Sequence, residues 1–351
     1  MQKRDHKVIP FSSGLWDRLM MLLAYKWKGK DTAQIEKNFT WRYLENPYTE
    51  RCFVYLAESN SILVGFRAFV LQKYLINNVT FDVFCPADAI VHPSFRRMGV
   101  FSRLTSELLK DLYNSHNYYS VILSLSSNKR SLPGNIKQGW CVGNGRRKDN
   151  YKISFRELIL SVLKRKHYFG KPVFGQEVSF SFEISQTLRA SELATFWQKH
   201  RHKRKISNIR DEKFFLWRFG LTKEKYNYMY CYDEEQLVAY LIIRKKKGLK
   251  SILEEYGVKE QRLLKPVINS AIRELGIPVL KTLTVSDHQS KLLYGCGFFQ
   301  KPDWYLKLIN KKALPVLIKP VCPQPEEKDY FVEGVDCRDM ENWIIYKSDE
   351  H

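Results

Sequence analysis

Residues 91–104 read VHPSFRRMGVFSRL and join an apolar, strand-like segment to a helix-like one. Pro93 ends the strand because proline has no N–H to give to a sheet. A helix is expected to begin near Phe101 or Ser102, and the free N–H groups of its first turn, at the positive end of its dipole, attract anions. Gly99 lets the backbone approach a ligand without a Cβ in the way. The stretch therefore predicts an anion-binding turn.

Two arginines indicate which kind of anion the turn is expected to bind. Arg96 and Arg97 add guanidinium groups whose geometry suits phosphate oxygens. The spacing fits neither G-x-x-x-x-G-K-[ST] nor the dinucleotide pattern G-x-G-x-x-G. We interpret the stretch as a diphosphate-binding turn of a different kind.

The segments around this turn predict a domain of alternating helices and strands. The turns Ser59-Asn60 and Asn77-Asn78 separate three segments rich in β-branched and aromatic residues. Residues 102–115 have helical periodicity with Leu104, Leu108, Leu109 and Leu112 on one face. The expected order is α-α-β-β-β-α-β: helices over 12–27 and 32–44, strands over 52–58, 62–76 and 79–93, a helix over 102–115, and a strand over 118–127.

The second half of the chain repeats the first. The segment from Trp41 to Val64 is matched by one from Trp217 to Val238, with separations of 23 (64 − 41) and 21 (238 − 217) residues. The other matches keep the same order, so we predict two copies of one fold. They are CPADAIV (85–91) with SILEEYGV (251–258), a helix-like then a strand-like segment in each half, and IKQGWCV (136–142) with LLYGCGFF (292–299).

At the anion turn the sequence resembles the GNAT acyltransferase superfamily, whose signature is a strand, V-x-P, [RQ]-x-x-G-x-[GA] and a helix. Arg96 and Gly99 match this pattern, and Phe101 stands where the family has Gly or Ala. The resemblance implies an α/β (α+β) fold of two GNAT-like domains, each a mixed, mostly antiparallel sheet flanked by helices. The second domain is degenerate, because KEQRLLKPV (259–267) has no R-x-x-G, and we expect no cofactor there.

The resemblance also implies acetyl-CoA or another acyl-CoA. Its pyrophosphate would lie on the amides around Arg97 to Ser102, and its pantetheine would run between strands ending near Val91 and beginning near Tyr119. The implied cofactor-binding residues are Ile90, Val91, Arg96, Arg97, Met98, Gly99, Val100, Phe101 and Ser102.

An amine that attacks a thioester must lose a proton, and a carboxylate can accept it. Asp88 precedes the anion turn and is our predicted base, with a structural carboxylate that pairs with an arginine as the alternative. Glu255 aligns with it in the second copy, next to Glu254. His92 is a further candidate base, although its place at the strand exit favours a solvated turn histidine.

The general acid stays open. The family often has a tyrosine four residues before a Gly-aromatic pair, where this chain has Asn135 before Gly139. Asn128, with Ser126 and Ser127, is our candidate donor of a hydrogen bond to the pantetheine or the thiolate. In the second copy Tyr294 stands three residues before Gly297-Phe298.

Composition narrows the class of protein. Of 351 residues, 58 are Lys or Arg and 37 Asp or Glu, so the net charge is +21 and polyanionic partners are favoured. Seven scattered cysteines with no C-x-x-C pair indicate reduced thiols in a cytoplasm.

We expect no metal, because HRHKRK (200–205) has no further ligand at suitable spacing. No apolar run of about 18 residues predicts a membrane span, and the N-terminus lacks the apolar region of a secretory signal.

We expect four parts along the chain: an N-terminal domain that binds acyl-CoA (1–155), a basic linker (156–178), the degenerate domain (179–310), and a C-terminal extension that packs on the domains (311–351). The linker includes an apolar and basic stretch suited to peripheral membrane contact. Nucleic acid is not favoured as a partner, since most aromatic residues fall at strand and core-like positions.

The predicted activity is transfer of an acetyl group from acetyl-CoA to an amine, by direct attack in a ternary complex. The acceptor is a small or carrier-linked amine, with an amino sugar favoured by a resemblance of FTWRYLENP (39–47) and ENWIIYKSDE (341–350) to acyltransferases of bacterial surface-polysaccharide pathways. The alternatives are an aminoacyl-tRNA-dependent transferase with two GNAT-like halves and a non-catalytic basic binding module.

Overall fold

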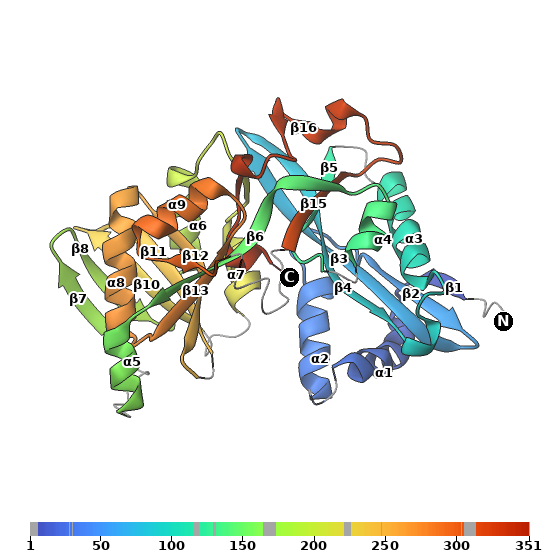
Figure 1. Ribbon diagram of the computed structural model, residues 1–351, viewed down its shortest axis with the longest axis horizontal. Coiled ribbons are helices and arrows are strands. Elements are labelled where there is room, and N and C mark those ends of the chain that lie inside the picture. The colour runs from blue at the N-terminus through green and yellow to red at the C-terminus, as the bar shows by residue number, and fades with distance from the viewer. Residues whose placement is uncertain are drawn as a thin grey trace. The chain divides into compact units, whose positions relative to one another are not determined.

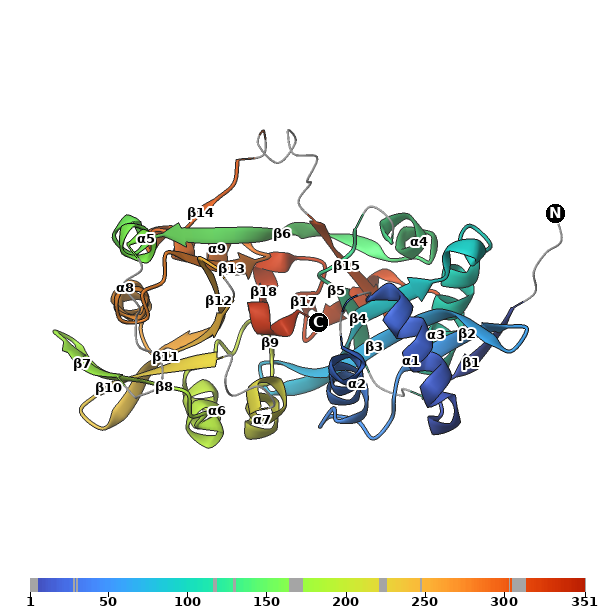
Figure 2. The same cartoon turned by 90° about the horizontal axis from the view of Figure 1, so that it is seen from below.

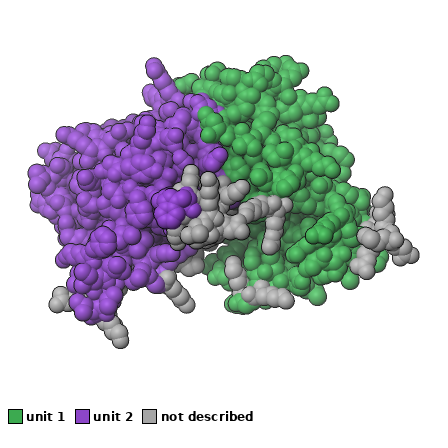
Figure 3. Space-filling view, viewed as in Figure 1, with its two compact units in different colours: residues 1–144, 315–338, 351 green, residues 145–314, 339–350 purple. Residues whose placement is uncertain are grey.

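The computed structural model describes the chain in two compact units (Figure 3). Unit 1 comprises residues 1–144, 315–338 and 351, and unit 2 comprises 145–314 and 339–350. The residues that the structure describes are 6–27, 29, 31–115, 119–128, 131–163, 173–220, 226–246, 248–302, 304 and 314–350.

Unit 1 is built on a six-stranded sheet in the order β1-β2-β3-β4-β5-β15 (Figure 1). All neighbours are antiparallel except β4 and β5, which are parallel. The two expected turns are present, with Asn60, Ser61 and Asn77 at positive φ, but β1 was not expected. The strands are β1 (Lys7–Pro10), β2 (Val54–Ser59), β3 (Ile62–Ile76), β4 (Val79–Val91), β5 (Ser120–Ser124) and β15 (Leu314–Pro320).

Helices cover both faces of this sheet. Phe66 on β3 contacts the rings of Phe39 and Tyr43, which α2 and the following π turn supply. A Cβ on the preceding Gly65 would meet Val100 of α3 at 2.8 Å, so α3 lies on the other face. The elements are α1 (Trp16–Lys26), α2 (Thr32–Phe39), a π turn (Thr40–Leu44), α3 (Val100–Ser115) and α4 (Leu132–Lys137), followed near the C-terminus by β16 (Phe331–Val332) and β17 (Val335–Asp336).

The expected leucine face of α3 is confirmed. Leu104, Leu108, Leu109 and Leu112 are all buried, and three of them pack with Phe69 and Phe84 of the sheet. Burial of each such side chain stabilises the fold by roughly 1.5–3 kcal/mol, so this face anchors the helix whose first turn forms the candidate site.

Unit 2 repeats the pattern, with a sheet in the order β6-β13-β12-β11-β10-β8-β7 (Figure 2). Along this order only β12 and β13 are parallel, and outside it β18 pairs with β9 in parallel. Its strands are β6 (Cys141–Ile153), β7 (Val173–Glu177), β8 (Phe180–Ser185), β9 (Ile206–Asn208), β10 (Tyr226–Asp233), β11 (Gln236–Lys245), β12 (Lys250–Val258), β13 (Val279–Thr284), β14 (Phe299–Gln300) and β18 (Trp343–Ile344). Its helices are α5 (Phe155–Val162), α6 (Ala190–His200), α7 (Glu212–Phe219), α8 (Leu264–Glu274) and α9 (Asp287–Gly295).

Each unit takes its last strand from the other half of the sequence. In unit 1, residues 317–320 of β15 pair with β5, and in unit 2, residues 148–153 of β6 pair with β13. The units therefore divide at residue 145 rather than at the expected 155, because most of β6 belongs to the second sheet. For the same reason the expected extension 311–351 is shared: 315–338 belong to unit 1 and 339–350 to unit 2.

The expected linker 156–178 contains α5 and β7, both in unit 2, while its residues 164–172 lie outside the described part of the chain. Ser154 caps α5 by accepting a hydrogen bond from the N–H of Glu157 at 3.4 Å. The described ends of this segment are thus regular elements of the second sheet domain.

The two copies share an irregularity in the strand before the helix. In unit 1, Arg67 pairs with Ala89 and Phe69 with Pro86, so β4 has one extra residue opposite β3. In unit 2 the register between β11 and β12 shifts in the same way at Ile242 and Ile243. A bulge re-aims the side chains beside it, and it falls at Asp88 in one copy and at Glu254 and Glu255 in the other.

A buried charge cluster holds unit 2 together. Both carboxylate oxygens of Glu255 are 3.2 Å from nitrogens of Arg210, whose Nη2 also donates to both oxygens of Asp349 at 2.9 Å. The three side chains are almost completely buried. Burial raises the pKa of Glu255 to about 7, although Arg210 opposes the shift.

We predict that Arg210→Met destabilises the protein, because it leaves two buried carboxyl groups without their cation. Removing one partner of a buried pair costs about 3–5 kcal/mol. Arg262→Met is the matched control, since Arg262 pairs with Glu260 on the surface and such pairs contribute about 0–1 kcal/mol. Urea unfolding of the two variants should separate them, and equal losses would contradict a structural role for the cluster.

Candidate functional site

The predicted anion turn is a tight loop between β4 and α3. A 3₁₀ turn at Pro93–Phe95 is followed by Arg97 at φ 63° and Gly99 at φ 79°, and α3 begins at Val100, slightly earlier than expected. Positive φ favours glycine, and nothing lies within 4 Å of where a Cβ on Gly99 would be. Arg96 and Arg97 are exposed. The turn thus offers open space, two cations and the first N–H groups of a long helix.

The strands beside the turn separate. β4 and β5 pair only from Asp82 to Phe84 and from Ser120 to Ile122, so beyond these residues the two strands no longer form a ladder. The predicted contacts Ile90 and Val91 lie on the separated end of β4, with Ile90 buried and Val91 half-buried. Backbone polar groups along such an edge need other partners. This opening suits an extended chain carrying amides, as pantetheine does.

An arginine that the sequence analysis missed lies under the turn. Arg67 on β3 is only 4% exposed, and its Nε and Nη2 atoms are buried with no hydrogen-bond partner. Its guanidinium lies 4.9 Å from the Phe69 ring and 5.1 Å from the Phe101 ring. Burial lowers the pKa of Arg67 to about 10, partly offset by Tyr43 and Asp88. The available signal was a single arginine inside the apolar run 62–76.

Phe101 fills the position where the resembled family has Gly or Ala. Its ring covers Arg67 on one side and packs against α4 on the other, where a Cβ on Gly134 would lie 2.8 Å from Phe101. The bulky Phe101 and the missing side chain of Gly134 are therefore complementary. Phe101, which departs from the family signature, therefore has a packing partner in this chain.

Asp88, the predicted base, is surrounded by donors. Its Oδ2 accepts hydrogen bonds from Arg42 Nη1 at 2.8 Å and from the Tyr43 hydroxyl at 2.9 Å, and Lys26 Nζ lies 3.6 Å from Oδ1. Burial and the nearby Asp88 charge raise the pKa of Tyr43 well above its usual value. Burial lowers the pKa of Arg42, but Tyr43 and Asp88 outweigh it and raise the pKa. These contacts favour the structural alternative, and the base assignment stays a prediction.

His92 behaves as the expected turn histidine. Its Nδ1 accepts a hydrogen bond from the N–H of Ser94 at 3.4 Å, and its ring lies 5.2 Å from the Tyr25 ring. These contacts hold the start of the anion turn.

The end of β5 carries a hydrogen-bonded polar row instead of the family's tyrosine. Asn135 Nδ2 donates to Ser127 Oγ at 3.1 Å, and Ser127 Oγ lies 2.9 Å from Ser124 Oγ. Asn135 Oδ1 is buried without a hydrogen-bond partner. The predicted Asn128 is exposed, and its Oδ1 accepts from the N–H of Ser131 at 3.4 Å. Asn128 thus shapes the entrance to α4, and its role towards a thiolate stays a prediction.

These features match a known family. The sequence of residues 7–128 matches the acetyltransferase (GNAT) domain family. The match includes β4, the anion turn, α3 and β5, so the expectation of an acetyltransferase is confirmed for this GNAT domain. No curated protein sequence matches the chain.

Solved structures share the fold over both halves. A conserved protein of unknown function from Enterococcus faecalis V583, described as a probable N-acyltransferase, has a TM-score of 0.59 and 13% identity, and the match covers 93% of this chain and 75% of that one. A GCN5-related N-acetyltransferase from Anabaena variabilis ATCC 29413 has a TM-score of 0.61 and 13% identity, with 91% and 73% covered.

A tandem GNAT protein from the clavulanic acid biosynthesis pathway has a TM-score of 0.55 and 10% identity, and the match covers 92% of this chain and all of that one. At such identities the likeness shows the fold alone. The predicted fold class, mixed α/β with two GNAT-like halves, is confirmed.

The remaining predicted residue, Glu255, belongs to unit 2 rather than to the GNAT domain. Its carboxylate is enclosed by Arg210 and by the hydroxyl of Ser348. It is completely buried, so its contacts indicate a structural role. Among the described residues there is no group of three or more His, Cys, Asp or Glu side chains that could hold a metal ion. Nor is any described helix long and apolar enough to cross a membrane.

We predict that Asp88→Asn lowers the thermal stability of the GNAT domain. The amide keeps the shape but loses the charge that balances the half-buried Arg42, and hydrogen bonds to charged groups contribute about 1.5–3 kcal/mol. Melting temperature, CoA affinity and turnover should be measured on this one variant.

Because Asp88 is also the predicted base, turnover should fall by about 10²–10⁴-fold, and unchanged turnover would remove Asp88 from the mechanism. Glu107→Gln is the control, because Glu107 pairs with Lys110 on the exposed side of α3, and this variant should change none of the three quantities.

Proposed function

We propose that this protein is an acyl-CoA-dependent N-acyltransferase whose cofactor binds to unit 1. The observation that carries the proposal is the combination of the open anion turn, with Gly99 at φ 79°, and the separation of β4 from β5 directly before it. The turn supplies cations and helix N–H groups for a diphosphate, and the separated strands supply an edge for the pantetheine. Both features lie inside the matched GNAT domain.

The residues fit acyl-CoA in charge and shape. The pyrophosphate would contact the backbone N–H groups from Arg97 to Ser102, with Arg96 nearby as an additional cation. Arg67 adds positive charge beneath Phe101, at the first turn of α3. When bound, the cofactor supplies the thioester carbonyl that is attacked.

The proposed reaction is a direct transfer. The amine nitrogen forms a bond to the acyl carbon, the carbon–sulfur bond breaks, the amine loses one proton, and the thiolate of CoA leaves and is protonated. Asp88 is the proposed proton acceptor, directly or through water. The proposed step uses no enzyme thiol, and Cys85, the cysteine of β4, is buried with its sulfur 3.2 Å from Oε1 of Gln72.

The proposed acceptor is an amine on a small molecule or a carrier, with an amino sugar favoured by the resemblance of 39–47 and 341–350 noted in the sequence. A cytoplasmic location would suit the reduced cysteines and the use of acetyl-CoA.

A screen of thiol release from acetyl-CoA against amines and nucleotide-linked amino sugars tests the proposal. CoA should bind with a stoichiometry of one per chain. Failure of every acceptor together with failure of CoA to bind would overturn the proposal.

We predict that Gly99→Val abolishes measurable CoA binding, because a β-branched residue resists positive φ and places a side chain where the diphosphate approaches. Arg96→Ala should weaken binding by about 1–2 kcal/mol, as a charge-assisted contact does. Gly334→Val is the matched control, since Gly334 also has positive φ (74°) and open space but lies in the β16–β17 turn. Calorimetric titration with CoA gives all three affinities, and wild-type affinity in Gly99→Val would refute the site.

We predict that Arg67→Met has opposite effects on stability and binding. Removing buried donors that have no partner should raise the free energy of unfolding by about 1–3 kcal/mol. The same change should weaken CoA binding, because a cation under the first turn of α3 is lost. Arg51→Met is the control, since Arg51 pairs with Asp111 and should not stabilise when removed. Destabilisation by Arg67→Met would show that the guanidinium has a protein partner.

A further inference from the structure

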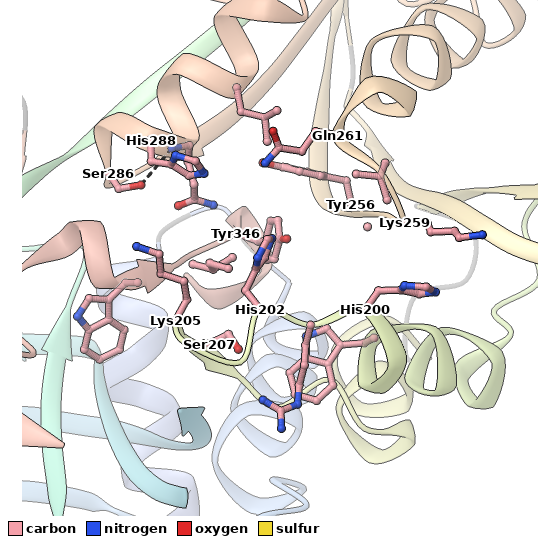
Figure 4. Close-up of a pocket in the computed structure, with 18 of the residues that line it drawn as sticks. His200, His202, Lys205, Ser207, Tyr256, Lys259, Gln261, Ser286, His288 and Tyr346 are labelled. Carbon is pink, nitrogen blue, oxygen red and sulfur yellow. Dashed lines mark hydrogen bonds between the residues drawn. The ribbon is translucent and has the colours of Figure 1, made fainter. Parts of the chain in front are cut away.

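Unit 2 contains a pocket at the place where its own parallel strands separate. β12 and β13 pair only over Lys250–Ile252 and Val279–Lys281, as the equivalent strands of unit 1 do over three residues. The C-terminal segment enters this opening: the backbone of Ile345 exchanges two hydrogen bonds with the side chain of Gln289, at 3.1 and 3.3 Å. The segment fills part of the opening and leaves a pocket of about 160 Å³ beside it (Figure 4).

The pocket has an apolar, aromatic floor. Tyr256 at the end of β12 lies 4.8 Å from Tyr346, and Tyr240 lies 5.5 Å from Phe196. Gly257 makes this arrangement fit, because a Cβ there would lie 2.3 Å from the Tyr240 ring. With roughly 10–15 Å³ of such volume per water molecule, the pocket can hold a small ring with a polar substituent.

The charged side chains that line the pocket are almost all basic. Six lining side chains carry or can carry positive charge, and they come from the end of α6, the loop after it, the residue after β12 and the start of α9: His200, Arg201, His202, Lys205, Lys259 and His288. Figure 4 labels all of them except Arg201. The one acidic lining residue is Glu341. Its two oxygens accept hydrogen bonds from the N–H groups of Asp287 and His288, at 2.6 and 3.1 Å, and so cap α9.

The positive charges act on one another. Burial, then Lys199 and Lys259, lowers the pKa of His200. Burial, then His288 and Lys205, lowers the pKa of His202. Within the described residues these imidazoles are not gathered into a group that could hold a metal. An anion in their midst would relieve the repulsion and favour their protonated forms.

We propose that unit 2 binds a small molecule in which an anionic group is attached to an aromatic or other flat apolar body. The body lies on the tyrosines and Phe196, and the anion lies among His200, His202, His288 and Lys259. The second copy of the fold, which lacks the diphosphate turn, has in this way a ligand site of a different chemical class. The proposal is independent of acyl-CoA binding in unit 1.

Calorimetric titration with benzenesulfonate tests the proposal, because this probe keeps a single negative charge across the range in which histidine titrates. We expect saturable binding at one site, and affinity that falls between about pH 5 and about pH 7 as the imidazoles lose their protons, because burial lowers the pKa values of His200 and His202 below the usual histidine value. The groups facing the histidines are the lysines and arginine named above and the capped carboxylate of Glu341. Benzyl alcohol, which has the ring without the charge, should not bind. Benzoate and phenyl phosphate then distinguish a carboxylate ligand from a phosphate ligand.

Variants decide where the probe binds. Lys259→Met and His288→Gln should each weaken binding about 10-fold or more, which corresponds to 1.4 kcal/mol. Lys250→Met removes the same charge from the exposed opposite end of β12 and should leave the affinity within about threefold. Gly99→Val should bind the probe as the wild type does.

Three results would overturn the proposal. They are the absence of saturable binding to the wild-type protein at about pH 5, an equal loss in Lys250→Met, and a loss in Gly99→Val, which would place the probe at the anion turn of unit 1. Circular dichroism of Lys259→Met and His288→Gln verifies that these exposed substitutions leave the fold intact.

Discussion

The separation of a parallel strand pair after three paired residues is the constraint on which both units depend. A strand that leaves its neighbour exposes backbone groups that must find other partners. In unit 1 the separated strands lead to the open turn at Gly99, and we propose that an acyl-CoA supplies those partners. In unit 2 the C-terminal segment of the chain enters the opening: the Gln289 side chain binds the backbone of Ile345, and the Ser348 hydroxyl reaches the carboxylate of Glu255. One geometry thus produces a candidate cofactor site in one copy and a packed core with a residual pocket in the other.

The two units differ in how the charge of a buried arginine is balanced. Arg210 of unit 2 is surrounded by Glu255 and Asp349, so its charge is balanced within the protein. Arg67 of unit 1 has two buried nitrogens with no hydrogen-bond partner, and Tyr43 and Asp88 offset only part of the effect of its burial. A buried cation with no directly paired anion costs stability, and groups perturbed by burial cluster at functional sites. The contrast supports a structural role for the carboxylates of unit 2 and a ligand-binding role for unit 1.

Neither half of the sequence builds a complete sheet by itself. Residues 148–153 complete the sheet of unit 2, and residues 317–320 complete that of unit 1. Pairing between segments far apart in sequence has a large loop-closure cost, and packing must offset it. The exchange explains why a boundary placed by composition at 155 falls ten residues beyond the structural one at 145. It also gives the C-terminal segment two roles, a strand in one unit and a core element in the other.

The sequence alone determined the fold class, the repeat, the leucine face of α3 and the glycine turn before that helix, because hydrophobic period, turn residues and a glycine before a helix are local signals. Local signals could not show that Asp88 is held by Arg42 and Tyr43, since these residues are more than 40 positions away and meet Asp88 only when the sheet forms. For the same reason the sequence showed Arg67 only as one polar residue in an apolar strand. It showed the basic residues that line the pocket of unit 2 only as separate charges. Which strand completes which sheet, and which buried charge finds a partner, was decided by tertiary packing alone.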